Sequence, residues 1–365
     1  MKRILFVATY TPSTLGAGVG YSNQLLMELS KSCEIDMVYF DYNGEPEYLI
    51  PNNNVRVLKR VEISLWFKIK GLLLLPWIFP LFTCRFSWSI CRFIRNQVKH
   101  THYDYIYFDF SQCFAYSLFV KHPNKILMSH DVIYQKYSRM KPYLKPWVRI
   151  SEKSLLHTGN AIFTFSEKDC MMIKEMYGLE SQPTTFYLIP NVIDAKPSKS
   201  ENYFVLFGGW SREENHEAFT WFLDNVYKEV AGRFGFKVIG GGMPQDILLR
   251  IKDCTDIEYL GFVDNPYPII ANAIAEIAPL HKGAGVKVKC IEALACGCPI
   301  IGTNIAFEGI SDNFSSFMKC TDDPKEYVHL INNWRFTLEQ RQNFKHYFID
   351  QYNNKTILKY ILGND

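Results

Sequence analysis

The sequence predicts an α/β protein built from two doubly wound, parallel-sheet halves. The chain has 365 residues, a length that suits two domains of ordinary size. Short apolar runs rich in β-branched and aromatic residues alternate with segments of helical periodicity, the pattern of parallel sheets covered by helices on both faces. The alternation starts again after residues 197–200, a polar stretch with a proline that is typical of a linker.

The first half is expected to span residues 1–196, and the second half is expected to span residues 201–345. In the first half we expect strands at 4–8, 35–40, 105–108, 125–128 and 161–165, with a helix at 21–31. In the second half we expect strands at 203–207, 236–239, 257–259, 275–278 and 299–301, with a helix at 215–230. Residues 346–365 are expected to form a C-terminal helix that packs back on the first half.

The composition excludes several classes of protein. With 48% hydrophobic and 21% charged residues, the chain has enough apolar material for two cores and is not a disordered chain. Forty basic residues against 37 acidic ones give a net charge of only +3, which argues against nucleic acid as a partner. The ten cysteines form no C-x-x-C pair, so no metal site is predicted. The first apolar run is too short for an export signal, and we expect a reducing, cytoplasmic compartment.

Residues 59–99 depart from this average, because they carry eight basic residues against one acidic residue, a net charge of +7. Their apolar stretch at 71–82 is interrupted by Pro76 and Pro80 and is shorter than the ~20 residues of a membrane span. One interpretation is a helix–loop–helix packed on the first half with a solvated basic face. The other, which we favour, is an insertion whose aromatic and basic side chains meet an anionic membrane surface. The side chains expected to face the membrane are Trp66, Lys68, Lys70, Trp77, Arg85, Trp88, Arg92 and Arg95.

The strongest chemical signal is the run from Ala278 to Pro299, which has the pattern of a strand, a glycine-rich turn and a helix starting near Val286. Backbone N–H groups of such a turn can approach an anion closely, and the helix dipole favours negative charge at the same end. Lys287 and Lys289 bring cationic side chains to this end, and Glu292 is placed to accept hydrogen bonds from ribose hydroxyls. The run therefore predicts a site for a nucleotide phosphate.

A second glycine loop, with Gly16, Gly18 and Gly20, follows the first strand. Its spacing and its distance from the strand differ from the dinucleotide fingerprint G-x-G-x-x-G. Asp41 nevertheless ends the second predicted strand as a ribose-binding acid would, which leaves an NAD-dependent oxidoreductase as an alternative function. His130 follows the strand at 125–128, and therefore lies at the sheet edge where α/β proteins bind ligands; Asp109 ends the preceding strand in the same way.

Together these elements resemble the retaining glycosyltransferases of family 4 (glycosyl transferases group 1). That family has the GT-B architecture, two Rossmann-like domains facing a cleft, here with a helical C-terminal segment. The resemblance extends over almost the whole chain. It is carried by the loop at 16–20, Ser166-Glu167 after a strand, Ile189-Pro190-Asn191, the run 207–210, the run 259–263 and above all the block at 283–299.

The resemblance implies that the first half binds the acceptor and the second half the donor. The donor, a nucleotide-diphosphate sugar, would lie in the cleft and be held by residues of both halves. Glu292 would hold the ribose, Lys287 would neutralise the leaving diphosphate, and His130 would lie near the sugar; these three are the expected catalytic residues. The expected donor-binding residues are Gly18, Gly20, Gly208, Gly209, Arg212, Gly283, Ala284, Gly285, Lys287, Lys289 and Glu292.

Two positions depart from the family pattern. Ala284 stands where the family often has the first glutamate of an E-x₇-E pair, and a methyl group cannot accept a hydrogen bond from a sugar. The usual arginine–lysine pair of the donor domain is also incomplete, since Arg212 is followed by Asn215 and His216 where the lysine is expected. Lys287 or Lys289 is expected to supply the missing charge.

The resulting expectation is a retaining, metal-independent glycosyltransferase with no cofactor besides its donor. It would transfer a sugar to a glycan or lipid-linked acceptor in bacterial surface polysaccharide or glycolipid synthesis, at the inner face of the plasma membrane. A non-catalytic sugar-nucleotide-binding protein is an alternative suggested by Ala284, and the oxidoreductase is a weaker one. The nucleotide base, the sugar, the acceptor and the linkage do not follow from the sequence.

Overall fold

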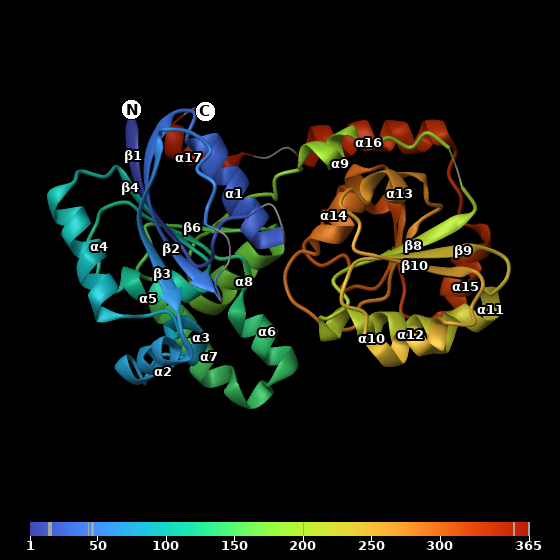
Figure 1. The fold of residues 1–365 in the computed structure, drawn as a ribbon, viewed down its shortest axis with the longest axis horizontal. Coiled ribbons are helices and arrows are strands. Elements are labelled where there is room, and N and C mark those ends of the chain that lie inside the picture. Colours follow the sequence, from blue (N-terminus) through green and yellow to red (C-terminus); the bar gives the residue numbers. More distant parts are fainter. Residues whose placement is uncertain (14–16, 43, 45–46, 200, 353–354, 364–365) are drawn as a thin grey trace. The chain divides into compact units, whose positions relative to one another are not determined.

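A computed structural model describes residues 1–365 except 14–16, 43, 45–46, 200, 353–354 and 364–365. The chain divides into two compact units. The first comprises Met1–Tyr187 and Asn354–Asp365, and the second comprises Leu188–Asn353. Each unit has one parallel β-sheet with helices packed against it (Figure 1).

The first unit has a seven-stranded sheet in the order β3-β2-β1-β4-β5-β6-β7. Its strands are β1 (Lys2–Ala8), β2 (Cys33–Tyr42), β3 (Val55–Ile63), β4 (Tyr105–Asp109), β5 (Lys125–Met128), β6 (Ala161–Thr164) and β7 (Gln182–Pro183). Its helices are α1 (Ala17–Leu29), α2 (Leu65–Leu74), α3 (Pro80–Thr83), α4 (Trp88–His100), α5 (Phe114–Ser117), α6 (Ile133–Met140), α7 (Lys145–Leu156), α8 (Glu167–Tyr177) and α17 (Thr356–Leu362). The chain runs outward from β1 to β3 and then returns to place β4 on the other side of β1.

The second unit repeats this topology with six strands in the order β10-β9-β8-β11-β12-β13. They are β8 (Tyr203–Phe207), β9 (Gly235–Ile239), β10 (Ile257–Gly261), β11 (Glu276–Ala278), β12 (Ile300–Gly302) and β13 (Met318–Cys320). The helices are α9 (Pro190–Asp194), α10 (Glu213–Phe222), α11 (Lys228–Val230), α12 (Gln245–Ile251), α13 (Tyr267–Asn272), α14 (Val288–Ala295), α15 (Pro324–Asn333) and α16 (Leu338–Tyr352).

The predicted fold class is confirmed, and every predicted strand is present in one of the two sheets. The strands that the sequence pattern did not indicate are all edge strands: β3 and β7 border the first sheet, and β13 forms one edge of the second. β3 is the clearest case, because Arg56, Lys59 and Arg60 interrupt its apolar pattern. Edge strands tolerate such charges because one side faces solvent, so their hydrophobic signal is weak.

The unit boundaries differ from those expected at residues 196 and 346. Helix α9 belongs to the second unit, since Val192 is fully buried in its core. Helix α16 also stays with the second unit, and only the last helix, α17, packs on the first. There the Lys2 ammonium donates to the carbonyl oxygen of Ile361 at 2.6 Å, near the C-terminal end of α17. A cation at this end complements the helix dipole.

The segment 59–99 is not an insertion throughout, because residues 59–63 belong to β3 and are followed by α2, α3 and α4. Its aromatic residues divide between two environments: Phe79, Phe82 and Phe86 are buried in the core of the first unit, whereas its three tryptophans, Trp66, Trp77 and Trp88, are exposed. Within the described part of the chain, no helix has both the length and the apolar character needed to span a membrane.

Arg85 was expected to face a membrane, and this prediction is wrong. Its side chain is buried, with the guanidinium carbon 4.5 Å from the centre of the Tyr10 ring. The reason is that Phe82 and Phe86, on either side of it in the sequence, both anchor in the core and draw the chain inward. The other expected residues are exposed, except Lys68, which is half-buried.

Helix α16 holds the C-terminal end of α14 through two buried cationic side chains. The Lys345 ammonium donates to the carbonyl oxygens of Ala295 at 2.8 Å and Val192 at 3.1 Å. The Arg341 guanidinium donates to the carbonyl oxygens of Gly297 at 2.9 Å and Ala271 at 2.6 Å. Cations stabilise the negative end of a helix dipole, so these contacts fix the helix whose other end forms the candidate site.

Candidate functional site

The strand order of each unit determines where a ligand would bind. In a doubly wound sheet the loops after the two central strands diverge, and ligands bind at the carboxyl ends of these strands. In the second unit these strands are β8 and β11, which lead into the loops at Gly208-Gly209 and at residues 281–287. In the first unit they are β1, which leads toward α1 with Gly18 and Gly20 in its first turn, and β4, which ends at Asp109 and is followed by Phe110.

The loop after β11 has a backbone that requires glycine at two positions. Gly283 and Gly285 have φ angles of 121° and 70°, which side chains with a Cβ rarely adopt. The helix after this loop begins at Val288 rather than near Val286 as predicted, because Lys287 is extended at the N-cap position. The Lys287 ammonium donates to the carbonyl oxygen of Gly285 at 2.5 Å and lies 3.7 Å from the Glu308 carboxylate. A cation, a glycine turn and a helix N-terminus thus meet at one point, an arrangement that suits an anion.

The loop after β8 is tied to this first loop through Asn215, near the start of α10. The Asn215 amide nitrogen donates to the carbonyl oxygen of Gly209 at 2.9 Å, and its amide oxygen accepts from the Lys289 ammonium at 3.1 Å. A Cβ on Gly208 would lie 3.1 Å from the Asn215 side chain, so this glycine lets the two elements approach. Arg212 is exposed at the N-cap of α10.

Asn215 was noted in the sequence only as standing where the family has a lysine. In the structure it holds Lys289, a lysine from α14, beside the Gly208-Gly209 loop. A lysine ammonium from α14 therefore lies beside the Asn215 side chain of α10.

Glu292 lies one turn further along α14 and is partly buried. The Tyr267 hydroxyl donates to its carboxylate at 3.0 Å. Burial raises the pKa of Glu292 to about 7, although the hydrogen bond from Tyr267 acts in the opposite direction. Ala284, which is half-buried, presents a methyl group in the loop. Glu292 is therefore a carboxyl group that can change its charge near neutral pH.

A second carboxyl group, Glu276 at the start of β11, is fully buried beside α14 and was not identified from the sequence. Neither of its carboxyl oxygens has a hydrogen-bond partner among the described residues. Burial raises its pKa to about 8; Lys289 opposes this shift, and the negative charge of Glu292 adds to it. Glu276 is therefore protonated in the folded protein at neutral pH.

We expect Glu276→Gln to stabilise the protein, and to do so more as the pH rises. The pKa of Glu276 is higher in the folded protein than in the unfolded chain. Its contribution to wild-type stability is therefore fully present below pH ~4.5 and is lost as the pH rises toward 8. The glutamine amide titrates in neither the folded nor the unfolded state. The stability of the variant relative to wild type should therefore rise by on the order of 2–4 kcal/mol between pH ~4.5 and 8. Thermal unfolding at pH 5.5 and 8 checks this, with the exposed Glu258→Gln as the control. A melting-temperature difference that stays constant with pH would contradict the prediction.

In the first unit, the candidate site is centred on a buried pair, Asp109 and His130. The His130 Nε2 atom lies 2.9 Å from one Asp109 carboxylate oxygen, and the Ser22 hydroxyl donates to the other at 2.5 Å. Asp109 is almost fully buried and His130 is 8% exposed, so the pair is shielded from bulk water. The carboxylate fixes the imidazole orientation, in the way that second partners fix ligating or catalytic histidines.

Phe110 forms the floor under the imidazole ring, and sequence reasoning missed it. Its ring stacks on His130 with the centres 3.4 Å apart and the planes within 9°. Among the described residues it is the one non-glycine residue with a positive φ angle, 64°, a strained conformation that often occurs at functional sites. A Cβ on Gly18 would lie 2.7 Å from this ring and 3.3 Å from His130 Nδ1. A residue larger than glycine at position 18 would therefore collide with the Phe110 ring.

The other glycines of the predicted loop, of which Gly20 also lies in α1, are less constrained. A Cβ on Gly20 would make only an ordinary contact, 3.8 Å from the carbonyl oxygen of Ser13, and Gly16 lies outside the described residues. Asp41, which the oxidoreductase alternative needs for ribose, is the last residue but one of β2, and its carboxylate accepts from the Arg60 guanidinium at 2.6 Å. An acid already paired in this way does not favour the oxidoreductase.

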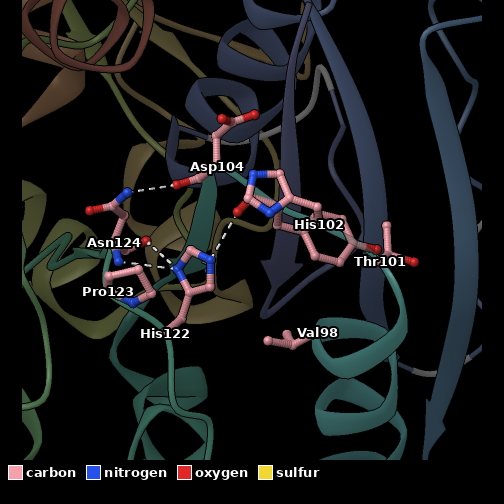
Figure 2. A pocket seen from close by; sticks show the side chains of 8 residues that line it. Val98, Thr101, His102, Asp104, His122, Pro123 and Asn124 are labelled. Atoms are coloured by element: carbon pink, nitrogen blue, oxygen red, sulfur yellow. Dashed lines mark hydrogen bonds between the residues drawn. The ribbon is translucent and has the colours of Figure 1, made fainter.

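The pocket drawn in Figure 2 lies away from these residues, in front of the amino ends of β4 and β5. Its volume is about 280 Å³, and its wall includes His102, Asp104, His122 and Asn124. The His122 ring bonds to the carbonyl oxygen of Tyr103, and the Asn124 amide donates to that of Asp104. These polar groups serve the turns that precede the strands, so we do not regard this pocket as the candidate site.

Two further observations concern metals and cysteines. No group of three or more His, Cys, Asp or Glu residues that could hold a metal ion occurs among the described residues. All ten cysteines are free thiols: seven are buried, Cys84 and Cys254 are half-buried, and Cys320 is exposed.

Comparison with known proteins gives a family match for part of the chain and a fold for all of it. Residues 201–334, a little over a third of the chain, match the family model described as glycosyl transferases group 1. The resemblance inferred from the sequence is thereby confirmed for the second unit. No curated protein sequence matches the chain.

Solved structures match it along its whole length. Sucrose-phosphate synthase from Thermosynechococcus elongatus aligns with a TM-score of 0.69 at 12% identity, over 100% of this chain and 98% of that one. TarM from S. aureus, in a complex with fondaparinux, alpha-GlcNAc-glycerol and UDP, aligns with a TM-score of 0.68 at 13% identity, over 100% of both chains. WaaG, a glycosyltransferase involved in lipopolysaccharide biosynthesis, aligns with a TM-score of 0.64 at 11% identity, over 99% of this chain and 100% of that one. The fold is therefore of the GT-B class.

Proposed function

We propose that this chain, whose second unit matches the glycosyl transferases of group 1, is a retaining glycosyltransferase that uses a nucleotide-diphosphate sugar. The observation that carries the proposal is the arrangement at the end of β11. There the turn with Gly283 and Gly285, the Lys287 ammonium and the N-terminus of α14 come together within the residues that match the family.

The proposed chemistry follows from charge. Cleavage of the bond between the anomeric carbon and the diphosphate leaves negative charge on the diphosphate oxygens. Backbone N–H groups and a cation that are already in position stabilise this charge as it develops. Lys287 and Lys289 are the proposed cations. The Lys287 ammonium contacts the loop after β11, and the Lys289 ammonium contacts Asn215, whose side chain also bonds to the loop after β8. Because these groups supply the stabilising charge, no bound metal ion is needed for such a step. We propose a metal-independent reaction without a cofactor.

The remaining residues are proposed to contact the ribose, the nucleotide, a phosphate and the sugar. Glu292 would accept hydrogen bonds from the ribose, as the family resemblance implies, and the backbone at Gly208 and Gly209 would border the nucleotide. Arg212, exposed at the start of α10, can swing toward a phosphate. In the first unit His130, held by Asp109 and Phe110, would contact the transferred sugar.

For the acceptor we propose a glycan or a lipid-linked glycan in bacterial surface polysaccharide or glycolipid synthesis. Two of the similar structures support this class: WaaG acts in lipopolysaccharide biosynthesis, and the TarM complex holds a GlcNAc-glycerol. We further propose that the enzyme works at the inner face of the plasma membrane, because the exposed Trp66 and Lys70 of α2 and the exposed Trp77 that follows it suit an anionic lipid surface.

A non-catalytic sugar-nucleotide-binding protein is the second candidate, and the half-buried Ala284 favours it. A methyl group at this position offers no hydrogen bond to a sugar hydroxyl, so donor binding could persist without efficient transfer. Release of free sugar or transfer of sugar from the donor by the purified chain would decide between the two candidates.

We expect nucleoside diphosphates to bind with an affinity that falls as the pH drops below 7. Ribose hydroxyls donate to the ionised form of Glu292, and the pKa of this group without ligand is about 7. Below that pH, Glu292 must lose its proton when the nucleotide binds, and this raises Kd by up to tenfold for each pH unit. Thermal-shift titration with UDP, GDP and ADP at pH 6, 7 and 8 measures this, since a ligand at 100 times its Kd adds ~2.7 kcal/mol to stability.

Glu292→Gln is the matched control, because it keeps the shape of the side chain and removes its titration. The nucleotide phosphates themselves titrate near pH 6 to 7, and this contribution remains in the variant, so the difference between the two proteins isolates Glu292. Equal pH dependence in both proteins would argue against a ribose contact by Glu292. A chain that binds none of the nucleotides would overturn the proposed function.

A further inference from the structure

The first unit carries a second basic segment beside α2, which the sequence reading did not single out. Residues 133–157, which form α6, a 3₁₀ turn and α7, contain six basic residues and one acidic residue. That acid is Glu152, which is buried and accepts hydrogen bonds from the backbone N–H groups of Ile133 at 2.7 Å and Tyr134 at 2.9 Å. The charge that this segment presents to solvent is therefore entirely positive.

The same segment exposes large apolar side chains on one face. Tyr143, Trp147 and Ile150 follow a helical spacing, and Tyr143 and Ile150 are 76% and 68% exposed. Helix α2 shows the same feature, because Trp66, Ile69 and Leu73 share its outer face while Phe67 and Leu74 pack inward. On each helix, exposed apolar residues thus alternate with basic ones.

Direct contacts join these two faces through Trp77, which follows α2 in the sequence and is 67% exposed. The Trp147 indole N–H donates to the carbonyl oxygen of Trp77 at 2.9 Å. The next residue but one, Phe79, packs edge-on against Trp147, and its N–H donates to the Ser151 hydroxyl at 2.8 Å. Figure 1 shows α2, α3 and α7 together at the same end of the first unit. The outer faces of α2 and α7, with Trp77 between them, form one surface.

We propose that this surface, defined by Trp66, Leu73, Trp77, Tyr143, Trp147 and Ile150, inserts into the headgroup region of an anionic lipid bilayer. Tryptophan and tyrosine prefer this depth, and Lys70, Arg149 and Lys153, exposed around the apolar face, pair with lipid phosphates. A second copy of the chain is a poor occupant, because a symmetric contact would place the same positive charges against each other. A surface of exposed apolar side chains surrounded by cations is complementary to acidic lipid.

This inference deepens the proposed function, since a lipid-linked acceptor would be presented at such a surface. It also changes the expected membrane face. Arg85 is buried, and the outer face of α4, with Arg92 and Arg95, adds only Trp88 as a large exposed apolar side chain. The inserting face therefore consists of α2 and α7, and the arginines of α4 are outside it.

Flotation of the full chain with phosphatidylcholine vesicles, with and without phosphatidylglycerol, tests the proposal. We expect binding only to the anionic vesicles, weakened by added salt because exposed charges are screened. Trp66→Ser with Leu73→Ser, and separately Tyr143→Ser with Ile150→Ser, should each lower the partition coefficient roughly tenfold or more. Arg149→Gln with Lys153→Gln should lower it roughly 30-fold.

Matched controls come from the same molecule. Leu249→Ser with Phe262→Ser removes equally exposed apolar side chains from the second unit and should leave binding unchanged. Arg92→Gln with Arg95→Gln on α4 should weaken binding less than the pair on α7. Absence of binding, equal binding to neutral vesicles, or a stronger effect on α4 than on α7 would overturn the proposal. A dimer that the serine variants convert to a monomer would show instead that a second copy covers this face.

The vesicle experiment contains neither donor nor acceptor, so its result is independent of the proposed chemistry. Failure of nucleotide binding would overturn the function and leave the membrane surface untouched. Failure of flotation would overturn the surface and leave the transferase intact. The circular dichroism spectrum and melting temperature of each variant confirm that it is folded before either result is interpreted.

Discussion

Replacing Lys287 by alanine is expected to lower the rate of sugar transfer by roughly a hundredfold to a thousandfold. The Lys287 ammonium lies over the glycine turn, 2.5 Å from the carbonyl oxygen of Gly285 and beside the start of α14. Its charge would act mainly on the diphosphate as it departs, since negative charge grows there in the transition state. The loss should therefore appear chiefly in kcat, with a smaller change in KM. Steady-state kinetics with the donor identified by thermal shift measures both.

Lys282→Ala is the control for this prediction, because Lys282 lies in the same loop and faces away from the turn. Its ammonium bonds to Glu213 and Glu217 at 2.8 Å each, on the exposed side of α10. Exposed pairs of this kind contribute little to stability, so this variant should keep nearly full activity. If both lysine variants lost activity equally, the effect would come from disturbance of the loop, and the role of Lys287 would be refuted.

The candidate site of the second unit could be predicted because its residues lie close together in the sequence. The glycines at 283 and 285, Lys287 and Glu292 lie on one turn and the helix after it, so their spacing alone brings them together. The start of α14 was placed two residues early, because the extended conformation of Lys287 depends on the turn before it and leaves no mark in the helical periodicity.

What the sequence could not supply were contacts between distant segments. Asn215 and Lys289 are separated by 74 positions and meet only because β8 and β11 are neighbours in the sheet. Phe110 looked like an ordinary aromatic residue after a strand, and its strained backbone and its stacking on His130 depend on the fold. Arg85 was misplaced for the same reason, since a local count of charge does not show which side chains turn inward.

The second large effect is expected in the first unit, where His130→Ala should lower transfer roughly a hundredfold without unfolding the protein. Asp109→Ala should lower activity to a similar extent, because the imidazole loses the carboxylate oxygen 2.9 Å from its Nε2 atom. It should also cost ~1–3 kcal/mol of stability, since the buried Ser22 hydroxyl loses its acceptor as well. Asp109→Asn keeps a carbonyl oxygen for His130 and should restore much of the activity.

The double variant decides whether Asp109 acts through His130. If its only role in transfer is to orient the imidazole, removing both side chains should reduce the rate no more than removing His130 alone. Additive losses would show that Asp109 contacts the substrate itself, and a fully active His130→Ala would remove this pair from the proposed site. Asp104→Asn is the control, because Asp104 lies before β4, at the opposite end of that strand, where its carboxylate accepts from the Arg3 N–H at 2.7 Å. A substitution at that end should change stability without changing transfer, since ligands of such sheets bind at the carboxyl ends of the strands.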